Sequence, residues 1–536
     1  MNPMARYDII IKNGLVFDGK GNKPEEVDIG IKGDEIKKIG DLQKENADEV
    51  IDASGKYVAP GFLDLTNHSD THWTLFLYPS QESLIRQGIT TIVGGNCGTS
   101  LAPFIGEASL EEIQRWVDVS KVNINWWTTG EFFSALKNHK FAVNFCTLIG
   151  FSTLQKAVLG KEVRLMTEKE INQMELLLKN ALQEGVFGLS TNFGGGHIKS
   201  LRDEDIGALL KIIKQYEAVA SHHLEDEGEN ILPAISRLII LARKSEAKMH
   251  ISHFKALGRN SWNFFPKAIE MIKNARQENV KLTADFFPYA KTGSNLFTLL
   301  PSWVKKLTNE EICGILKSRE DKRKNDLLDY LEQLTLHYDK IIIASTLSEL
   351  GVVGKTIEQL SKISGLAGGE IILSLLETNN LRVSIFNEVI SEENIELIAK
   401  EEFSAVASDG VGYTISNLKS QISNPNDLPH PRSFGAFPRV FNLYVKEKPI
   451  LNWENAIYKM TGLPAEILGI KDRGIIAKEK KADIIVFDPK VIFDQATYDN
   501  PFQYSSGVEQ VLINGTIVLS NEEFTGKFPG YVLRKT

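Results

Sequence analysis

The chain has 536 residues, of which 42% are hydrophobic and 24% charged, the composition of a large globular protein. Its net charge of -8 and isoelectric point near 5.8 argue against a nucleic-acid partner, which would need a basic face. The sequence contains no run of 18 apolar residues and no apolar signal-peptide region, so we expect no membrane association. The three cysteines lie far apart and make no disulfide framework, which favours a cytoplasmic location.

Short strands and turns dominate the two ends of the chain. Residues 1–58 contain three strand–turn–strand patterns typical of β-hairpins, and residues 471–536 return to the same style. The turns are expected at Asn13–Gly14, at Lys32–Gly33–Asp34, at Ser54–Gly55 and, near the C-terminus, at Asn514–Gly515. Because chain termini often lie close together, we predict one small β-sandwich made of an N-terminal half, 1–58, and a C-terminal half, 471–536.

The centre of the chain, residues 59–470, alternates apolar strands with helix-length segments. The helical pattern is clear at 168–185, where apolar residues recur at three and four spacing and Gly185 follows. Eight parallel strands predict a TIM-like (β/α)8 barrel. We place them near 59–66, 89–94, 141–149, 185–190, 216–221, 247–252, 280–286 and 403–408. The long interval of about 290–402 is expected to be an insertion near the mouth of the barrel that could act as a lid.

Four of the predicted strands end in chemically distinctive residues: Cys97, His223, His253 and Asp409. In a parallel barrel such residues converge on one face, however far apart they lie in the sequence. A thiolate and two imidazoles suit zinc, and a neighbouring carboxylate can carry protons. The pattern therefore predicts a metal-dependent hydrolase.

Each of these residues has an ordinary structural explanation when it is taken alone. An isolated cysteine is more often a buried core residue, and an aspartate before glycine is often a turn residue. Two histidines and a cysteine at equivalent strand ends favour a metal site instead. The neighbouring His222 and His250 are left out of this prediction. Residues three apart on a strand point to opposite faces, so His250 and His253 should not share a site, and His253 is preferred because it lies at the strand tip.

Nine segments, in order along nearly the whole chain, resemble the N-acyl-D-amino-acid deacylase (D-aminoacylase) family of the amidohydrolase superfamily. They are APGFLDL at 59–65, TTIVGGNCG at 90–98, FGLST at 187–191, HLEDEG at 223–228, ISHFKALG at 251–258, DFFPY at 285–289, ASDG at 407–410, HPRSFGAFPRVF at 430–441 and MTGLPAEILGIKDRGIIAKEKKADIIVFDP at 460–489. Their number and order, more than any single motif, identify the resemblance.

The resemblance implies a TIM-like barrel with a β-sandwich and a tightly bound zinc ion held by a cysteine and two histidines. These family positions correspond to Cys97, His223 and His253, and the catalytic aspartate corresponds to Asp409. Residues that contact the substrate carboxylate in the family correspond here to Lys255, Tyr289 and Arg432. An arginine offers a planar two-pronged donor for a carboxylate, which fits that assignment.

The chain departs from the family pattern at several positions. Where the family has His-x-His after the first strand, this chain has Thr66 and His68, so a second, weaker metal site is not expected, and His68 is left to line the pocket or contact the zinc. Phe151 and Gln155 replace a His and an Arg of the family, and Glu225 replaces another Arg.

The expected reaction is hydrolysis of the N-acyl amide bond of an N-acyl-D-amino acid. Zinc with an open fourth position lowers the pKa of water, and Asp409 would accept the water proton and return it to the leaving amine. Two alternatives remain open at this point. The chain could hydrolyse cyclic amides or D-dipeptides, or it could be a zinc-binding pseudoenzyme, because a fold alone does not guarantee activity.

Overall fold

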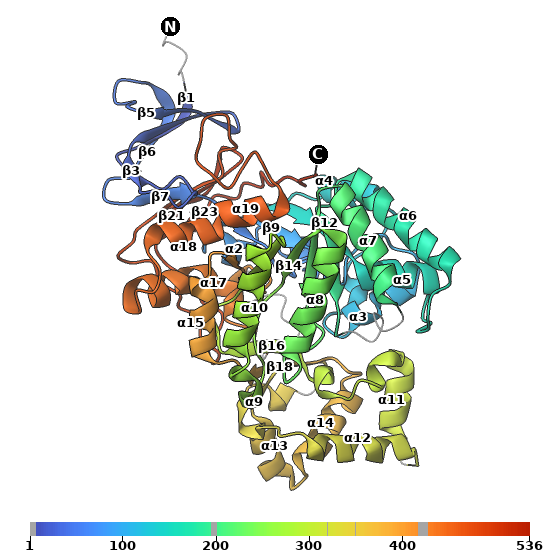
Figure 1. Ribbon diagram of the computed structural model, residues 1–536. Helices are drawn as coiled ribbons and strands as arrows, with labels where there is room; N and C mark the ends of the chain where they lie inside the picture. Colours follow the sequence, from blue (N-terminus) through green and yellow to red (C-terminus); the bar gives the residue numbers. More distant parts are fainter. Residues whose placement is uncertain (1–6, 195–200, 319, 349, 416–426, 536) are drawn as a thin grey trace.

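A barrel of parallel strands forms the centre of the protein (Figure 1). The computed structural model describes residues 7–194, 201–318, 320–348, 350–415 and 427–535. Within those ranges eight parallel strand positions follow one another around the barrel, as the sequence predicts. They are β8 (Phe62–Asp64), β9 (Ile89–Gly94), β10 with β11 (Asn144–Thr147 and Ile149–Gly150), β12 (Gly188–Asn192), β13 (Val219–His223), β14 (Lys248–Ile251), β15 (Leu282–Phe286) and β19 (Ser404–Val406).

The barrel closes where its last strand returns to its first. Beyond the ends of β8 and β19, Asn67 and Gly410 form a parallel bridge, and the Asp409 amide donates to the Thr66 carbonyl at 2.9 Å. The buried Asp64 carboxylate accepts from the amide of Ser408 at 2.8 Å. Since this seam joins residues about 340 positions apart, it brings His68 and Asp409 together at the carboxyl ends of the strands.

Helices cover the outside of the barrel. The predicted helix at 168–185 is α6 (Glu168–Glu184): Thr167 and Glu170 form a capping box, and Gly185 ends the helix at a φ of 107°. The other principal helices of the barrel layer are α5 (Phe151–Leu159), α7 (Asp203–Gln215), α8 (Ile231–Ser245), α10 (Phe265–Gln277), α15 (Glu392–Lys400), α17 (Arg432–Val440), α18 (Trp453–Met460) and α19 (Gly462–Leu468). No helix within the described ranges combines the length and the apolarity that crossing a bilayer requires.

The interval predicted to be an insertion contains a separate layer of structure, which lies at the bottom of Figure 1. Its antiparallel sheet has the order β16 (Lys291–Asn295), β18 (Val383–Glu388), β17 (Ile341–Thr346). Helices α11 (Asn309–Lys317), α12 (Lys322–Gln333), α13 (Ile357–Ser364) and α14 (Gly368–Thr378) pack on it around a hydrophobic cluster of their own. Ile395 and Ile398 of α15 belong instead to the main core, so α15 is a barrel helix by its packing. The predicted boundaries of the insertion, about 290 and 402, stay a prediction.

Strands from the two ends of the chain share one sheet, which fits the predicted sandwich. In this seven-stranded sheet β20 (Ile484–Phe487) pairs with β7 (Tyr57–Pro60), and β21 (Val508–Ile513) pairs with β20. Along β20 the side chains alternate: Ile484 faces a cluster shared with the four-stranded sheet, whereas Ile485 faces the barrel core. The remaining sandwich strands are β1 (Tyr7–Lys12), β2 (Leu15–Val16), β3 (Glu25–Glu26), β4 (Asp28–Lys32), β5 (Glu35–Gly40), β6 (Ala47–Asp52), β22 (Thr516–Ser520) and β23 (Glu523–Phe524).

Two of the four predicted hairpins are wrong. The turns at Asn13–Gly14 and Ser54–Gly55 carry the chain from the four-stranded sheet into the seven-stranded sheet, so the flanking strands do not pair. Asn13 bonds to Asp28 and Asp52 rather than closing a two-strand turn, and β1 pairs with β4 and β6. The turns at Gly33 and at Asn514–Gly515 are true hairpins, joining β4 to β5 and β21 to β22.

Gly188 at the start of β12 allows two barrel strands to approach closely. A Cβ atom at this position would lie 1.8 Å from the carbonyl oxygen of Val219 in β13. We therefore expect Gly188→Ala to lower the free energy of unfolding by about 1–3 kcal/mol, measured by chemical denaturation. Gly207→Ala in α7 is the control: no atom lies within 4 Å of its added Cβ, and alanine favours helix by about 0.5–1 kcal/mol. Equal destabilisation by the two changes would contradict this packing argument.

Candidate metal and catalytic site

Three polar side chains predicted from distant strands form one cluster at the mouth of the barrel. Cys97, His223 and His253 each offer a ligand atom, and these atoms all lie within 4.8 Å of one another. The Cys97 Sγ lies 3.3 Å from the His253 Nε2, which in turn lies 3.2 Å from the His223 Nδ1. We call these three residues the Cys–His–His cluster.

The chemistry and spacing of the cluster fit a zinc ion. Zinc held tetrahedrally by nitrogen and sulfur at about 2.0–2.3 Å requires ligand atoms about 3.3–3.8 Å apart. The His253 Nε2 lies close to such distances from the Cys97 Sγ, at 3.3 Å, and from the His223 Nδ1, at 3.2 Å. Burial alone would raise the pKa of the Cys97 thiol, but His253, His223 and His68 outweigh burial and hold it well below the ordinary value. The thiolate form, which binds metals, is therefore favoured.

Three of the four predicted site residues have a backbone conformation that differs from that of a β-strand. Cys97, His253 and Asp409 have φ values of 53°, 41° and 51°, in the left-handed region that residues other than glycine rarely adopt. His223, by contrast, is the last residue of β13. Such conformations cost free energy and persist where the surrounding structure enforces them, as happens at functional sites.

Asp409 lies between two cationic side chains next to the cluster. Its Oδ1 is 3.1 Å from the His68 Nε2, and its Oδ2 accepts from the Arg432 Nη1 at 2.5 Å. Burial would raise the pKa of Asp409, yet Arg432, His253 and His68 together lower it well below its usual range. The carboxylate is thus held in its charged, proton-accepting form.

The three predicted substrate-contact residues lie in different surroundings. Lys255 is drawn back toward the cluster, where its Nζ donates to the Glu227 carboxylate at 2.7 Å. Arg432, the first residue of α17, pairs with Asp409 and lies over the Phe287 ring. Tyr289 follows β15, and among the described residues its buried Oη has no hydrogen-bond partner. That orphaned hydroxyl is free to bind a ligand atom.

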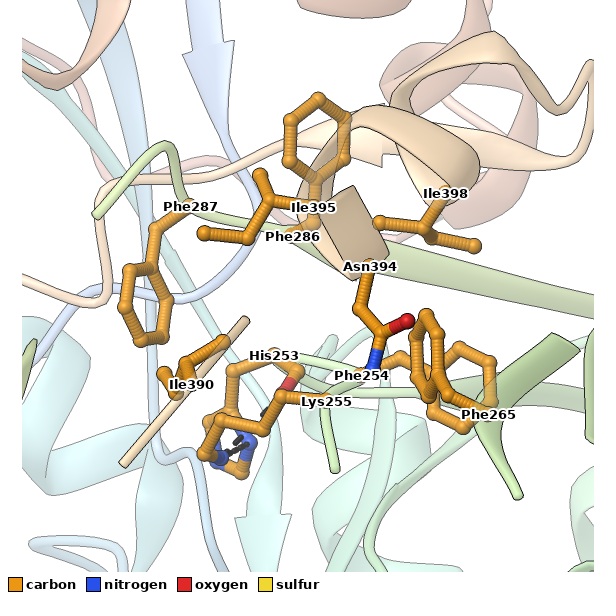
Figure 2. Close-up of a pocket in the computed structure, with 10 residues that line it drawn as sticks. All are labelled: His253, Phe254, Lys255, Phe265, Phe286, Phe287, Ile390, Asn394, Ile395 and Ile398. Atoms are coloured by element: carbon orange, nitrogen blue, oxygen red, sulfur yellow. Dashed lines mark hydrogen bonds between the residues drawn. The ribbon is translucent and has the colours of Figure 1, made fainter. Parts of the chain in front are cut away.

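A small pocket behind the cluster is apolar on its far side. Figure 2 shows the Lys255 side chain turned toward the His253 ring, with Phe254, Phe286 and Ile395 among the side chains around it. The other residues that line the pocket are Phe265, Phe287, Ile390, Asn394 and Ile398. This wall excludes water behind the cluster, which strengthens the electrostatic interactions made there.

Two buried acids near the cluster escape prediction from the sequence. Asp285, the first residue of the DFFPY motif, accepts from the His253 amide at 2.5 Å and from the Thr66 hydroxyl at 2.6 Å. Glu227 lies beside Lys255 and the two histidines of the cluster. Its spacing of four residues from His223 was the available signal, but Glu225 and Asp226 beside it are acids as well.

Residues excluded from the predicted site lie outside the cluster. The His222 Nδ1 bonds to the Thr191 hydroxyl at 2.7 Å, and the His250 Nε2 bonds to Asp285 at 2.9 Å. Of the departures from the family pattern, Phe151 is a buried residue of α5, whereas Glu225 pairs with Arg237 at the surface. Thr66 is fully buried and its hydroxyl is committed to Asp285.

Comparison with known proteins identifies relatives that share this architecture over their full length. The amidohydrolase family model matches residues 378–518. The N-acyl-D-aspartate deacylase of Alcaligenes xylosoxydans xylosoxydans is 29% identical over 532 residues, covering 99% of this chain and 95% of the relative. The structure of the N-acyl-D-glutamate deacylase from Bordetella bronchiseptica, complexed with zinc and a phosphonate that mimics the tetrahedral intermediate, matches with a TM-score of 0.81. It is 26% identical and covers 98% of this chain and 99% of its own. A D-aminoacylase with a binuclear metal centre has the same TM-score, 27% identity and coverage of 99% and 100%.

Proposed function

This chain belongs to the N-acyl-D-amino-acid deacylases of the amidohydrolase family, and from that premise we propose that it hydrolyses the N-acyl amide bond of N-acyl-D-amino acids. The products are a carboxylate and a free D-amino acid. The observation that carries the proposal is the Cys–His–His cluster with the Asp409 carboxylate beside it, at the carboxyl ends of the barrel strands.

The enzyme is metal-dependent, and Cys97, His223 and His253 would hold one tightly bound zinc ion. The donor set of one sulfur and two nitrogens leaves a fourth position open, as catalytic zinc sites do. A second strongly held ion is not part of the proposal, because Thr66 stands where the family has a histidine and its hydroxyl already donates to Asp285.

Zinc, when bound, supplies Lewis-acid chemistry that lowers the pKa of water and polarises a carbonyl group. Asp409 then serves as the proton carrier: its carboxylate accepts a proton from the attacking water and returns it to the nitrogen of the leaving amine. His68 and Arg432 hold the Asp409 oxygens in place for both transfers. The apolar wall behind His253 keeps bulk water from competing.

The α-carboxylate of the substrate would be bound by Arg432, Tyr289 and Lys255. Arg432 lies against Asp409 and therefore within reach of a group bound next to the proton carrier. An arginine can hold a carboxylate through two parallel hydrogen bonds, which fixes its direction as well as its position. Fixing that group relative to the reacting carbonyl selects the D configuration at Cα.

The proposal is tested by metal analysis together with an enantiomer panel on the purified protein. We expect about one zinc per chain and hydrolysis of N-acetyl-D-amino acids in preference to their L-enantiomers. The same panel includes hydantoins and D-dipeptides. Turnover of those compounds alone would reveal a cyclic-amide or D-dipeptide hydrolase, and zinc binding without turnover of any compound would reveal a pseudoenzyme. Either outcome would overturn the proposal.

Tyr289→Phe separates substrate binding from folding. Since the buried Tyr289 Oη has no partner within the described ranges, its removal leaves no other group unsatisfied, and the unfolding temperature should not fall. A lost hydrogen bond to a charged substrate group is worth about 1.5–3 kcal/mol, so KM should rise by about 10- to 100-fold. Steady-state kinetics and thermal unfolding measure the two effects. An unchanged KM would remove Tyr289 from the substrate site.

A further inference from the structure

We propose that Glu227 is a positioning residue for the zinc site: its one carboxylate faces the outward nitrogens of both histidine ligands and sets their orientation and their tautomers. The Glu227 Oε1 lies 3.3 Å from the His253 Nδ1, and its Oε2 lies 3.7 Å from the His223 Nε2. These are the ring nitrogens opposite to the His253 Nε2 and His223 Nδ1 that face each other within the cluster. The inference rests on the zinc site of the proposed function.

The position of Glu227 is itself fixed from two sides. Its backbone carbonyl accepts from the Leu257 amide at 2.6 Å, which ties the loop after β13 to the loop after β14. Its carboxylate accepts from the Lys255 Nζ at 2.7 Å. The side chain is buried, so a charged group here needs partners, and the lysine with the two imidazoles supplies them.

Charge on Glu227 is favoured by the same neighbours. The Lys255 ammonium, which donates to the Glu227 carboxylate at 2.7 Å, compensates the buried negative charge. A negative charge therefore lies behind the two imidazoles. Such a charge makes a histidine a stronger metal ligand by accepting the hydrogen bond of its second ring nitrogen.

Lys255 explains why a carboxylate is needed at this point. The Lys255 Nζ lies 2.9 Å from the His253 Nδ1 (Figure 2), and an ammonium group has only donors to offer. If the lysine donated to the Nδ1, the neutral imidazole would carry its proton on the Nε2, the nitrogen that faces the cluster. The Glu227 Oε1 accepts from the lysine and lies 3.3 Å from the Nδ1, where it offers an acceptor for a proton on that nitrogen. With its proton on the Nδ1, His253 leaves the Nε2 free for a metal.

The two acids that precede Glu227 point elsewhere and provide matched comparisons. Glu225 pairs with Arg237 at 2.6 Å at the surface. Asp226 accepts from the Gly228 amide at 2.7 Å and holds the turn. Among three consecutive acids, Glu227 is thus the one directed at the histidines.

The decisive experiment compares the zinc affinities of wild type, Glu227→Gln and Glu225→Gln, measured by competition with a chelator in the absence of substrate. We expect the zinc dissociation constant to rise by about 10- to 100-fold in Glu227→Gln and to stay unchanged in Glu225→Gln. The visible absorption bands of the cobalt(II)-loaded proteins give a second readout. They should shift for Glu227→Gln, because the histidine ligands change orientation, whereas a loss of stability elsewhere would not shift them.

Glu227→Asp provides a test even if Glu227→Gln does not fold, since it keeps the charge and shortens the side chain. It should weaken zinc binding in the same direction, because the carboxylate no longer reaches both imidazoles. Wild-type zinc affinity and wild-type cobalt bands in the folded variants would overturn the inference and leave the hydrolase function intact. Weakened zinc binding in a protein that hydrolyses no acyl substrate would support the inference while overturning the function.

Discussion

Asp409→Asn should lower kcat for the D-substrate by about 10²- to 10⁴-fold, the contribution typical of a general acid–base, while the purified variant still binds zinc. Asparagine keeps the shape of the side chain and can still contact His68 and Arg432, but its amide cannot accept the water proton. Asp409 is not a member of the Cys–His–His cluster, so the change leaves the proposed metal ligands untouched. Steady-state kinetics and zinc analysis of the same preparation measure both effects.

Asp52→Asn is the matched control for this change. Asp52 ends β6 in the four-stranded sheet and bonds to Asn13 and Ser54 at the surface, so the same chemical change there should leave kcat unaltered. A wild-type kcat in Asp409→Asn would disprove the assigned proton transfer. Loss of zinc from that variant would instead show that the aspartate supports the metal.

The positions of the barrel strands could be predicted from the sequence because each apolar run ends at a polar residue. That pattern predicts both the strand order and the site: His223 is the last residue of β13, and Cys97 and His253 follow shortly after the ends of β9 and β14. Parallel strands bring their carboxyl ends to one face by geometry alone. The meeting of these three side chains therefore follows from the fold, even though 156 residues separate Cys97 from His253.

Contacts set by loops could not be predicted in this way. Glu225 and Glu227 are the same residue type and only two positions apart, and no periodicity says which side chain turns inward. The sequence likewise gives no sign that Lys255 also pairs with the buried Glu227. The same limit applies to Asn13–Gly14, where a strong turn signal fixes a bend but does not decide which sheet the next strand joins.

Cys97→Ala should abolish tight zinc binding and, with it, turnover. The thiolate is the anionic member of the cluster, and two neutral imidazoles alone hold the ion far less firmly. Because a bound metal contributes several kcal/mol to transition-state stabilisation, kcat/KM should fall by about 10³-fold or more. Chelator competition and kinetics measure these losses directly.

Thermal unfolding with and without zinc makes this prediction independent of the substrate. An ion that binds the folded chain stabilises it, so added zinc should raise the unfolding temperature of the wild type and leave that of Cys97→Ala unchanged. Cys313→Ala is the control, since Cys313 lies on α11 of the insertion layer and takes no part in the cluster. If Cys97→Ala kept the zinc-dependent rise and Cys313→Ala lost it, the sulfur ligand would be misassigned. Cys97, His223 and His253 would then lie together at the barrel mouth without binding the same ion.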